Sequence, residues 1–144
     1  MFKRILVPTD GSDITAHAVD TAIQLAKVHG AQLLTLSVME PFPYSAVSEI
    51  QPVPPQEFID AQLRVAAQRV EAVCVAAAAQ GMACFPHTIE ALHAWEAILE
   101  LAKNEQVDLI VMASHGRRGV AALLLGSETQ KVLTHTSLPV LIVK

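Results

Sequence analysis

No long hydrophobic run occurs in this 144-residue sequence, although hydrophobic residues make up 52% of it. Alanine and valine in short segments supply much of the excess, and no segment approaches the roughly 18 apolar residues that a membrane span requires. The basic and then apolar start is interrupted by Pro8-Thr9-Asp10, and it lacks the apolar core and cleavage site of a signal peptide. We therefore expect a single domain in a cytoplasmic protein that does not associate with membranes.

Positive charge and cysteine are also scarce. Ten Lys and Arg stand against 14 Asp and Glu, for a formal net charge of −4, and the cations form no basic stripe. This pattern disfavours nucleic acid as a partner, because binding to a phosphate backbone requires concentrated cations. Cys74 and Cys84 lack the spacing of a metal site or a redox motif. Their apolar surroundings predict two small buried residues rather than a disulfide.

Strand-like and helix-like segments alternate along the chain. Short apolar runs predict strands at 2–7, 31–39, 82–89, 107–112 and 138–143. Helical spacing predicts helices at 13–29, 57–80, 92–103 and 127–135, with Gly30 and Gly81 as stop signals. Leu63 and Leu133 belong to the faces that we expect to point inward. The proline-rich segment 40–56 predicts a long surface loop.

This alternation predicts a single doubly wound α/β domain. The strands are too apolar to have one face in water, which favours a parallel sheet with helices on both faces. Pro86 cannot donate a hydrogen bond to a neighbouring strand, so its strand is expected at an edge.

A glycine-rich loop follows the strand at 107–112. It contains Gly116, Gly119 and Gly126, and it ends at Ser127, where a helix is expected to begin. A strand, a glycine-rich loop and a helix N-terminus let backbone N–H groups approach a phosphate. Ser127 and Gln130 also fit an S-x-x-Q capping box, in which the hydroxyl serves only the helix. The two interpretations are compatible.

Other polar residues follow the first and fourth strands, where ligands bind in folds of this class. Asp10 is suited to accept hydrogen bonds from a ribose hydroxyl or an adenine amino group, or else it caps the next helix. Arg117 and Arg118 either pair with a phosphate chain or are ordinary solvated surface. His115 is a residue type that can act as a general base at neutral pH, but the sequence supplies no nucleophile or metal partner for it.

Taken together, residues 5–12, 108–127 and 138–143 resemble the universal stress protein family, and the resemblance extends over essentially the whole chain. It implies a five-stranded parallel sheet in the order 3-2-1-4-5 and a homodimer formed by antiparallel pairing of the last strands, here Pro139 to Val143. The branch of the family that binds ATP carries G-x2-G-x9-G-[S/T]. Gly116, Gly126 and Ser127 match this pattern, whereas Ala113 stands at its first glycine.

The resemblance also implies a site for ATP or AMP, with Mg²⁺ as an accompanying ion. Its expected cofactor-binding residues are Pro8, Thr9, Asp10, Val38, Met112, Ala113, His115, Gly116, Arg117, Gly119, Gly126, Ser127 and Glu128. Val38 would hold adenine through its backbone, and Gly126 and Ser127 would hold phosphates. If position 113 needs a positive φ, alanine costs about 1 kcal/mol or more there. If it needs only close approach of the ligand, the methyl group weakens binding.

The function expected from this resemblance is a nucleotide-binding stress-response module with at most slow ATP hydrolysis and no dedicated catalytic residues. The alternatives are a dimeric interaction protein that binds no nucleotide and an enzyme that uses ATP for adenylation.

Overall fold

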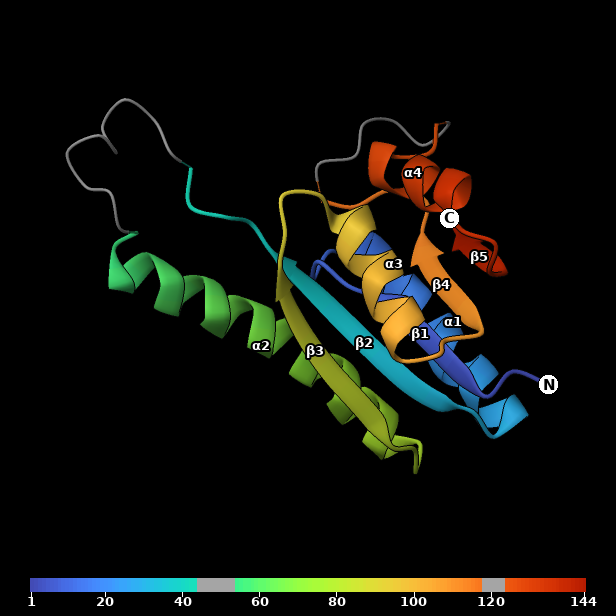
Figure 1. Cartoon of the computed structure of the whole chain (residues 1–144). Helices are drawn as coiled ribbons and strands as arrows, with labels where there is room; N and C mark the ends of the chain where they lie inside the picture. Colours follow the sequence, from blue (N-terminus) through green and yellow to red (C-terminus); the bar gives the residue numbers. More distant parts are fainter. Residues whose placement is uncertain (44–53, 118–123) are drawn as a thin grey trace.

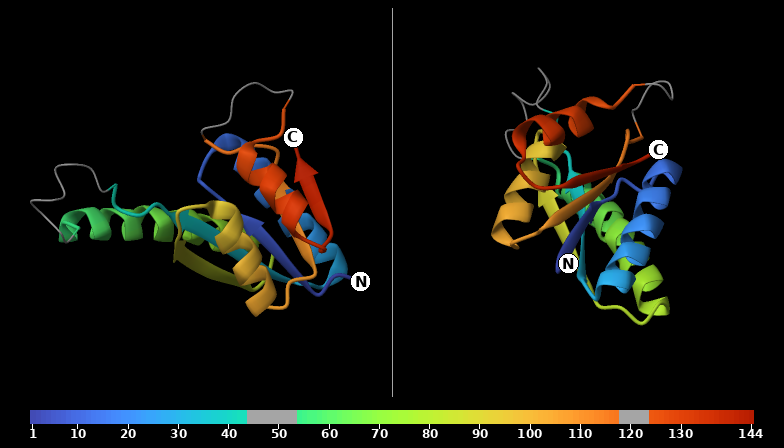
Figure 2. Two further views of the ribbon diagram at one scale, coloured as in Figure 1. Left: turned by 45° about the horizontal axis from the view of Figure 1, so that its top comes forward. Right: turned by 90° about the vertical axis from the view of Figure 1, so that its right-hand side faces the viewer.

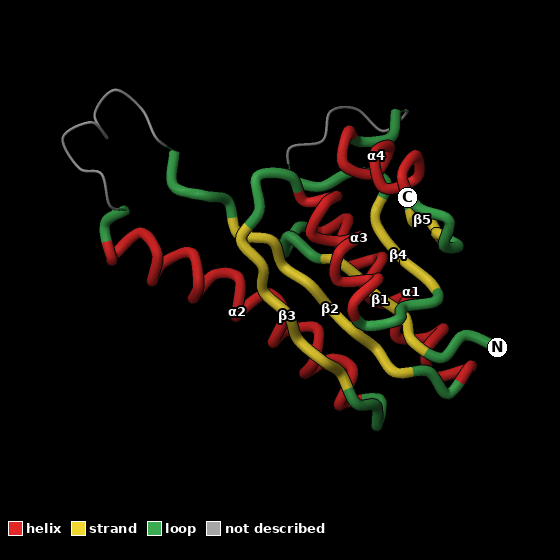
Figure 3. Tube along the Cα trace, in the orientation of Figure 1, coloured by secondary structure: helices red, strands yellow, loops and turns green. Residues whose placement is uncertain are grey.

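The computed structural model describes residues 1–43, 54–117 and 124–144 (Figure 1). Strands and helices alternate along these ranges, as Figure 3 shows. The strands are β1 (Arg4–Pro8), β2 (Gln32–Met39), β3 (Cys84–Glu90), β4 (Leu109–Ala113) and β5 (Val140–Val143). The helices are α1 (Asp13–His29), α2 (Gln56–Ala79), α3 (Ala94–Asn104) and α4 (Ser127–His135). These ends lie within two residues of the expected ones. Most of the expected loop at 40–56 lies outside the described residues.

The strands form one parallel sheet in the order β3-β2-β1-β4-β5, which confirms the predicted fold class. β1 lies at the centre, with Ile5 opposite Leu33 of β2 and Leu109 of β4. The chain first adds strands on one side of β1 and then on the other, so the strand order reverses between β1 and β4. Pro86 lies on the edge strand β3, as its missing N–H requires.

Helices cover both faces of the sheet, α1 and α2 on one and α3 and α4 on the other (Figure 2). Successive side chains of a strand point to opposite faces. Ile5 and Val7 therefore enter the core beneath α1 and α2, whereas Leu6 enters the core beneath α3 and α4. All three are fully buried.

Two leucines expected to point inward, Leu63 and Leu133, are exposed rather than buried. The N-terminal half of α2 projects beyond the sheet in both Figure 1 and Figure 2, so Leu63 has no strand to pack against and is 44% exposed. Burial on α2 begins at Ala66 and continues to Ala77. On α4, Val132 fills the inward position completely, and Leu133, one residue further around the helix, is 40% exposed.

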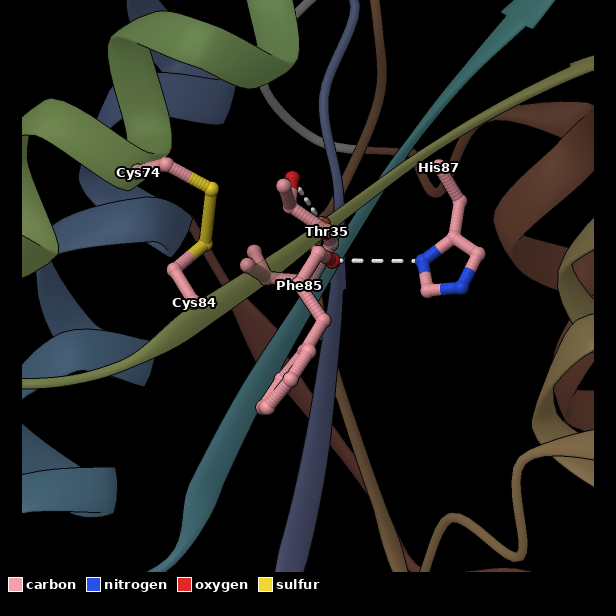
Figure 4. The surroundings of a disulfide bond; sticks show 6 residues. Thr35, Cys74, Cys84, Phe85 and His87 are labelled. Atoms are coloured by element: carbon pink, nitrogen blue, oxygen red, sulfur yellow. Dashed lines mark hydrogen bonds between the residues drawn. A yellow bond between two sulfur atoms is a disulfide. The ribbon is translucent and has the colours of Figure 1, made fainter.

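Cys74 and Cys84 form a disulfide, so the prediction of two unlinked cysteines was wrong. Gly81 adopts a positive φ of 75° and reverses the chain after α2, which brings β3 back along the helix. The Cα atoms of the two cysteines then lie 5.1 Å apart, within the range that a disulfide spans. Figure 4 shows the bond joining α2 to the start of β3. The sequence spacing did not reveal this pairing, because it depends on how the helix packs on the sheet.

Within the described part of the chain, no helix is long and apolar enough to cross a membrane.

Candidate functional site

A cavity of about 560 Å³ opens beyond the carboxyl ends of the central strands. It lies where the strand order reverses, the usual position of a ligand site in an open parallel sheet. The expected site residues that line it are Pro8, Thr9, Asp10, Val38, Met112, Ala113, His115, Gly116, Arg117, Gly126, Ser127 and Glu128. The tertiary fold thus gathers these residues around one space. Gly119 and Arg118 lie outside the described residues.

Asp10 joins the loop after β1 to the loop after β4. Its Oδ1 accepts hydrogen bonds from the backbone N–H of Ser12 at 2.9 Å and the hydroxyl of Thr15 at 3.1 Å. Its Oδ2 accepts a hydrogen bond from the backbone N–H of Arg117. The guanidinium of Arg117 donates in turn to the backbone oxygen of Asp10 at 3.0 Å. Asp10 therefore braces the turn before α1 and faces the cavity. The alternative that it caps α1 was wrong, because Ser12 is the N-cap residue and no side chain caps this helix end.

These contacts set the charge state of Asp10. Burial raises the pKa of the carboxyl group, but hydrogen bonds from Ser12, Arg117 and Thr15 favour its ionised form. The hydrogen bonds outweigh burial, and the pKa of Asp10 lies below its ordinary value. The cavity consequently holds a fixed negative charge at neutral pH.

Gly116 and Gly126 allow the loop after β4 to pack closely against its neighbours. A Cβ atom at Gly116 would lie 2.6 Å from Oδ2 of Asp10, and one at Gly126 would lie 3.1 Å from Cα of His115. Neither position requires a positive φ, because only Gly11, Gly30 and Gly81 have one among the described glycines. Space, rather than backbone strain, is what these two glycines supply.

Helix α4 begins at Ser127 and is preceded by Gly126 as its N-cap residue. No side chain caps this end of the helix, so the predicted capping box of Ser127 and Gln130 is wrong. The Gln130 side chain instead donates to the backbone oxygen of Leu125 at 2.7 Å. A capping box would need Ser127 as the N-cap residue. The helix instead begins one residue earlier than that, so Ser127 is its first helical residue. The first N–H groups of α4 and the positive end of its dipole therefore lie beside the cavity without a side-chain cap.

Ala113 is the last residue of β4 and pairs with Val143 of β5. Gln106 is the only described residue other than glycine with a positive φ, so position 113 needs no left-handed conformation. The Ala113 side chain is buried, and its backbone oxygen accepts a hydrogen bond from the Thr129 hydroxyl at 3.1 Å. The first of the two alternatives for Ala113, backbone strain, is thereby excluded.

His115 and Glu128 line the cavity but also have partners in the protein. Nδ1 of His115 is 3.1 Å from the hydroxyl of Ser114. Oε2 of Glu128 accepts a hydrogen bond from the backbone N–H of Trp95 at 2.7 Å, which caps the first turn of α3 from α4. Glu128 thus holds two helices together at the rim of the cavity.

Helix α2 contributes two polar side chains that sequence analysis did not identify, Gln62 and Arg69. They are separated by seven residues, or about two helical turns, and so lie on one side of the helix. That spacing was a signal in the sequence. The spacing alone could not show that these residues belong to the site, because the side of α2 that faces the cavity depends on how the helix crosses the sheet.

Comparisons with known proteins agree with this fold. The model of the universal stress protein family matches residues 1–144. A universal stress protein of Thermus aquaticus is 36% identical over 148 residues, covering 100% of both chains. The solved structure of a Methanocaldococcus jannaschii universal stress protein is 27% identical, covers 100% of this chain and 96% of its own, and superposes with a TM-score of 0.85. A universal stress protein solved in complex with cAMP is 26% identical, with coverage of 99% and 97% and a TM-score of 0.71.

The fold and the strand order agree with the match along the whole sequence. The chain belongs to the universal stress protein family.

Proposed function

We propose that this universal stress protein binds an adenine nucleotide, ATP or AMP, in the cavity beyond β1 and β4, and that occupancy of this site is its signal. The observation that carries the proposal is the start of α4. Its N–H groups have no side-chain cap and border the cavity, and Gly126 lets the loop before them pack closely on His115. A phosphate is the ligand that such a helix start binds best.

The end of β2 supports the adenine part of the proposal. The backbone oxygen of Leu36 accepts a hydrogen bond from the N–H of Thr9, so Leu36 directs its backbone groups toward β1. Alternate residues of a strand direct their backbone groups to the same side, and Val38 therefore does likewise. Because β1 ends at Pro8, opposite Leu36, the N–H and C=O of Val38 extend beyond the paired region. One donor and one acceptor at this spacing suit the edge of an adenine ring.

The residues around the cavity also suit the rest of a nucleotide. Asp10 is ionised and can accept a hydrogen bond from a ribose hydroxyl, and Arg117 supplies positive charge for phosphates. The described residues contain no cluster of three side chains suited to hold a metal ion. Mg²⁺ in this site would be bound mainly by phosphate oxygens and water, as is usual for nucleotide-bound magnesium.

The direct test is to purify the protein from cells, denature it and separate the released small molecules by nucleotide chromatography. We expect adenine nucleotide in near-stoichiometric amount, and an increase in melting temperature when ATP and Mg²⁺ are added to the emptied protein. No released nucleotide and no thermal shift would instead support a dimeric interaction protein that binds no nucleotide.

Gly126→Val should abolish the thermal shift, because its side chain would meet the backbone of His115 and displace the loop that leads into α4. Thr134→Val is a matched control, since it places the same side chain on the exposed part of α4. A full thermal shift in Gly126→Val would contradict this site. An ATP hydrolysis assay on the same variants tests whether turnover accompanies binding.

We further propose that the protein forms a homodimer through β5. This strand lies at the sheet edge, is four residues long and exposes Leu141 by 39%. An exposed apolar edge strand offers unpaired backbone groups to a second copy.

A further inference from the structure

Two arginines from distant parts of the chain converge over the turn at Gly11. The point where a Cβ of Gly11 would lie is 3.3 Å from Nε of Arg69 and 3.5 Å from Nη2 of Arg117. Gly11 has a φ of +78°, so this turn favours glycine, and it brings bare backbone beneath both side chains. Nε of Arg69 and Nη2 of Arg117 are thus no more than about 7 Å apart, and both side chains line the cavity.

The environment of Arg69 reflects this crowding. Burial lowers its pKa, and the nearby charge of Arg117 lowers it further, whereas Asp10 and Glu40 act in the opposite direction. The ion pairs within the described part of the chain join Arg4 and His87 to Glu105, and neither involves this pair of arginines. Two like charges at short range are unfavourable unless an anion joins them.

The carboxylate of Asp10 does not take up the donors of the pair. Its hydrogen bonds come from two backbone N–H groups and one hydroxyl. The guanidinium of Arg117 donates to the backbone oxygen of Asp10 with one nitrogen. A guanidinium carries five N–H donors, so both side chains retain donors for a ligand. Planar guanidinium groups match the oxygens of a phosphate in pairs.

The cavity therefore contains two separate elements that attract anions. One is the start of α4, whose first N–H groups border the cavity without a side-chain cap. The other is the pair of Arg69 and Arg117 over the Gly11 turn. This pair lies beside Asp10, whose carboxylate accepts a hydrogen bond from the backbone N–H of Arg117. The segment 114–117 connects the two elements. A nucleoside monophosphate has one phosphate for them, whereas a nucleoside polyphosphate has enough phosphates to contact both.

We infer that Arg69, together with Arg117, binds the distal phosphate of a nucleoside polyphosphate and makes the site favour ATP over AMP. The inference rests on the proposed function and adds a residue of α2 to the site. Sequence motifs in the loop after β4 do not identify Arg69, because Arg69 lies on α2, far from that loop in the sequence.

The test compares the affinities of ATP, ADP and AMP by titration calorimetry in the presence of Mg²⁺. Arg69→Gln should weaken ATP binding on the order of tenfold, and AMP binding less than about twofold, because the lost hydrogen bonds to a charged group involve only the distal phosphate. Arg69→Lys keeps the charge without the paired donors and should recover part of the preference. Arg64→Gln, a matched change on the exposed part of α2, should leave every affinity unchanged.

Arg69 also packs on the Gly11 turn, so each variant is first checked for an unchanged circular dichroism spectrum and melting temperature. If a variant melts early, the ratio of its ATP and AMP affinities still answers the question, since a general loss of folded protein lowers both equally. An unchanged ratio in Arg69→Gln overturns this inference and leaves the proposed function intact. Wild-type protein that binds no adenine nucleotide overturns both.

Discussion

Asp10 and Arg117 are linked twice, once from the Arg117 backbone N–H to the Asp10 carboxylate and once from the Arg117 guanidinium to the Asp10 backbone oxygen. They are separated by 107 residues in the sequence. The two hydrogen bonds join the loops after the neighbouring strands β1 and β4, and both loops line the same cavity. They fix the two loops relative to each other at the cavity wall.

The ionised Asp10 should make stability depend on pH. Its pKa in the folded protein lies below the ordinary value of 3.8, so its contribution is complete above that value and is lost as the pH falls through the folded pKa. Asp10→Asn should lower the free energy of unfolding by about 1 kcal/mol or more at neutral pH. Urea unfolding of both proteins at about pH 7 and about pH 2 measures the difference, which should shrink in acid. A difference that grows in acid would contradict this role.

Replacing Ala113 by glycine should restore the family's glycine pattern but reduce stability. Ala113 is a buried strand residue without positive φ, so glycine gains no conformational relief there. The added backbone freedom and the lost methyl group should together lower the free energy of unfolding by about 1–2 kcal/mol. Denaturant titration tests this. An Ala113→Gly protein that is more stable than wild type would show that alanine is strained at this position.

The disulfide between Cys74 and Cys84 should stabilise the packing of α2 on the sheet. The two cysteines are separated by only ten residues, and closing a loop of this length contributes roughly 2–3 kcal/mol. Dithiothreitol should therefore lower the melting temperature of the wild-type protein. It should not change that of the double variant Cys74→Ser and Cys84→Ser. Thiol titration of unreduced, denatured protein should find no free thiol, and two reactive thiols would rule the bond out.

The homodimer proposed at β5 should depend on Leu141. Leu141→Lys places a charge on the edge strand and should shift the protein to monomer in sedimentation velocity experiments at micromolar concentration. Leu63→Lys is a matched control, because Leu63 is 44% exposed and Leu141 39%, but it lies on α2, which packs near the opposite edge of the sheet. A wild-type monomer at this concentration, or equal effects of the two variants, would exclude β5 as the interface.

Local sequence patterns were sufficient to predict a doubly wound parallel α/β domain, whereas the full strand order came from the resemblance to a family. Apolar runs and helical spacing identified all the described strands and helices, because an element that is buried on one face has apolar residues at regular spacing along its sequence. The edge position of β3 followed from Pro86 alone, since proline lacks a backbone donor. Residue types and spacing pointed to Asp10, His115, Arg117 and the glycines of the β4 loop, and the resemblance to a family added the remaining expected site residues. The described structure gathers all of the expected cofactor-binding residues at one cavity except Gly119, which lies outside the described ranges.

Long-range packing decided what these patterns left open. Arg69 reaches the Gly11 turn, and Cys74 reaches Cys84, only because α2 crosses the sheet in one particular position. The choice between strain and space at Ala113 likewise required the backbone angles of β4. Periodicity records which side of an element is buried, and it contains no information about which distant element lies against that side. The sequence by itself therefore determined the order of the elements and most of their buried faces, and the tertiary structure decided which side chains meet at the site.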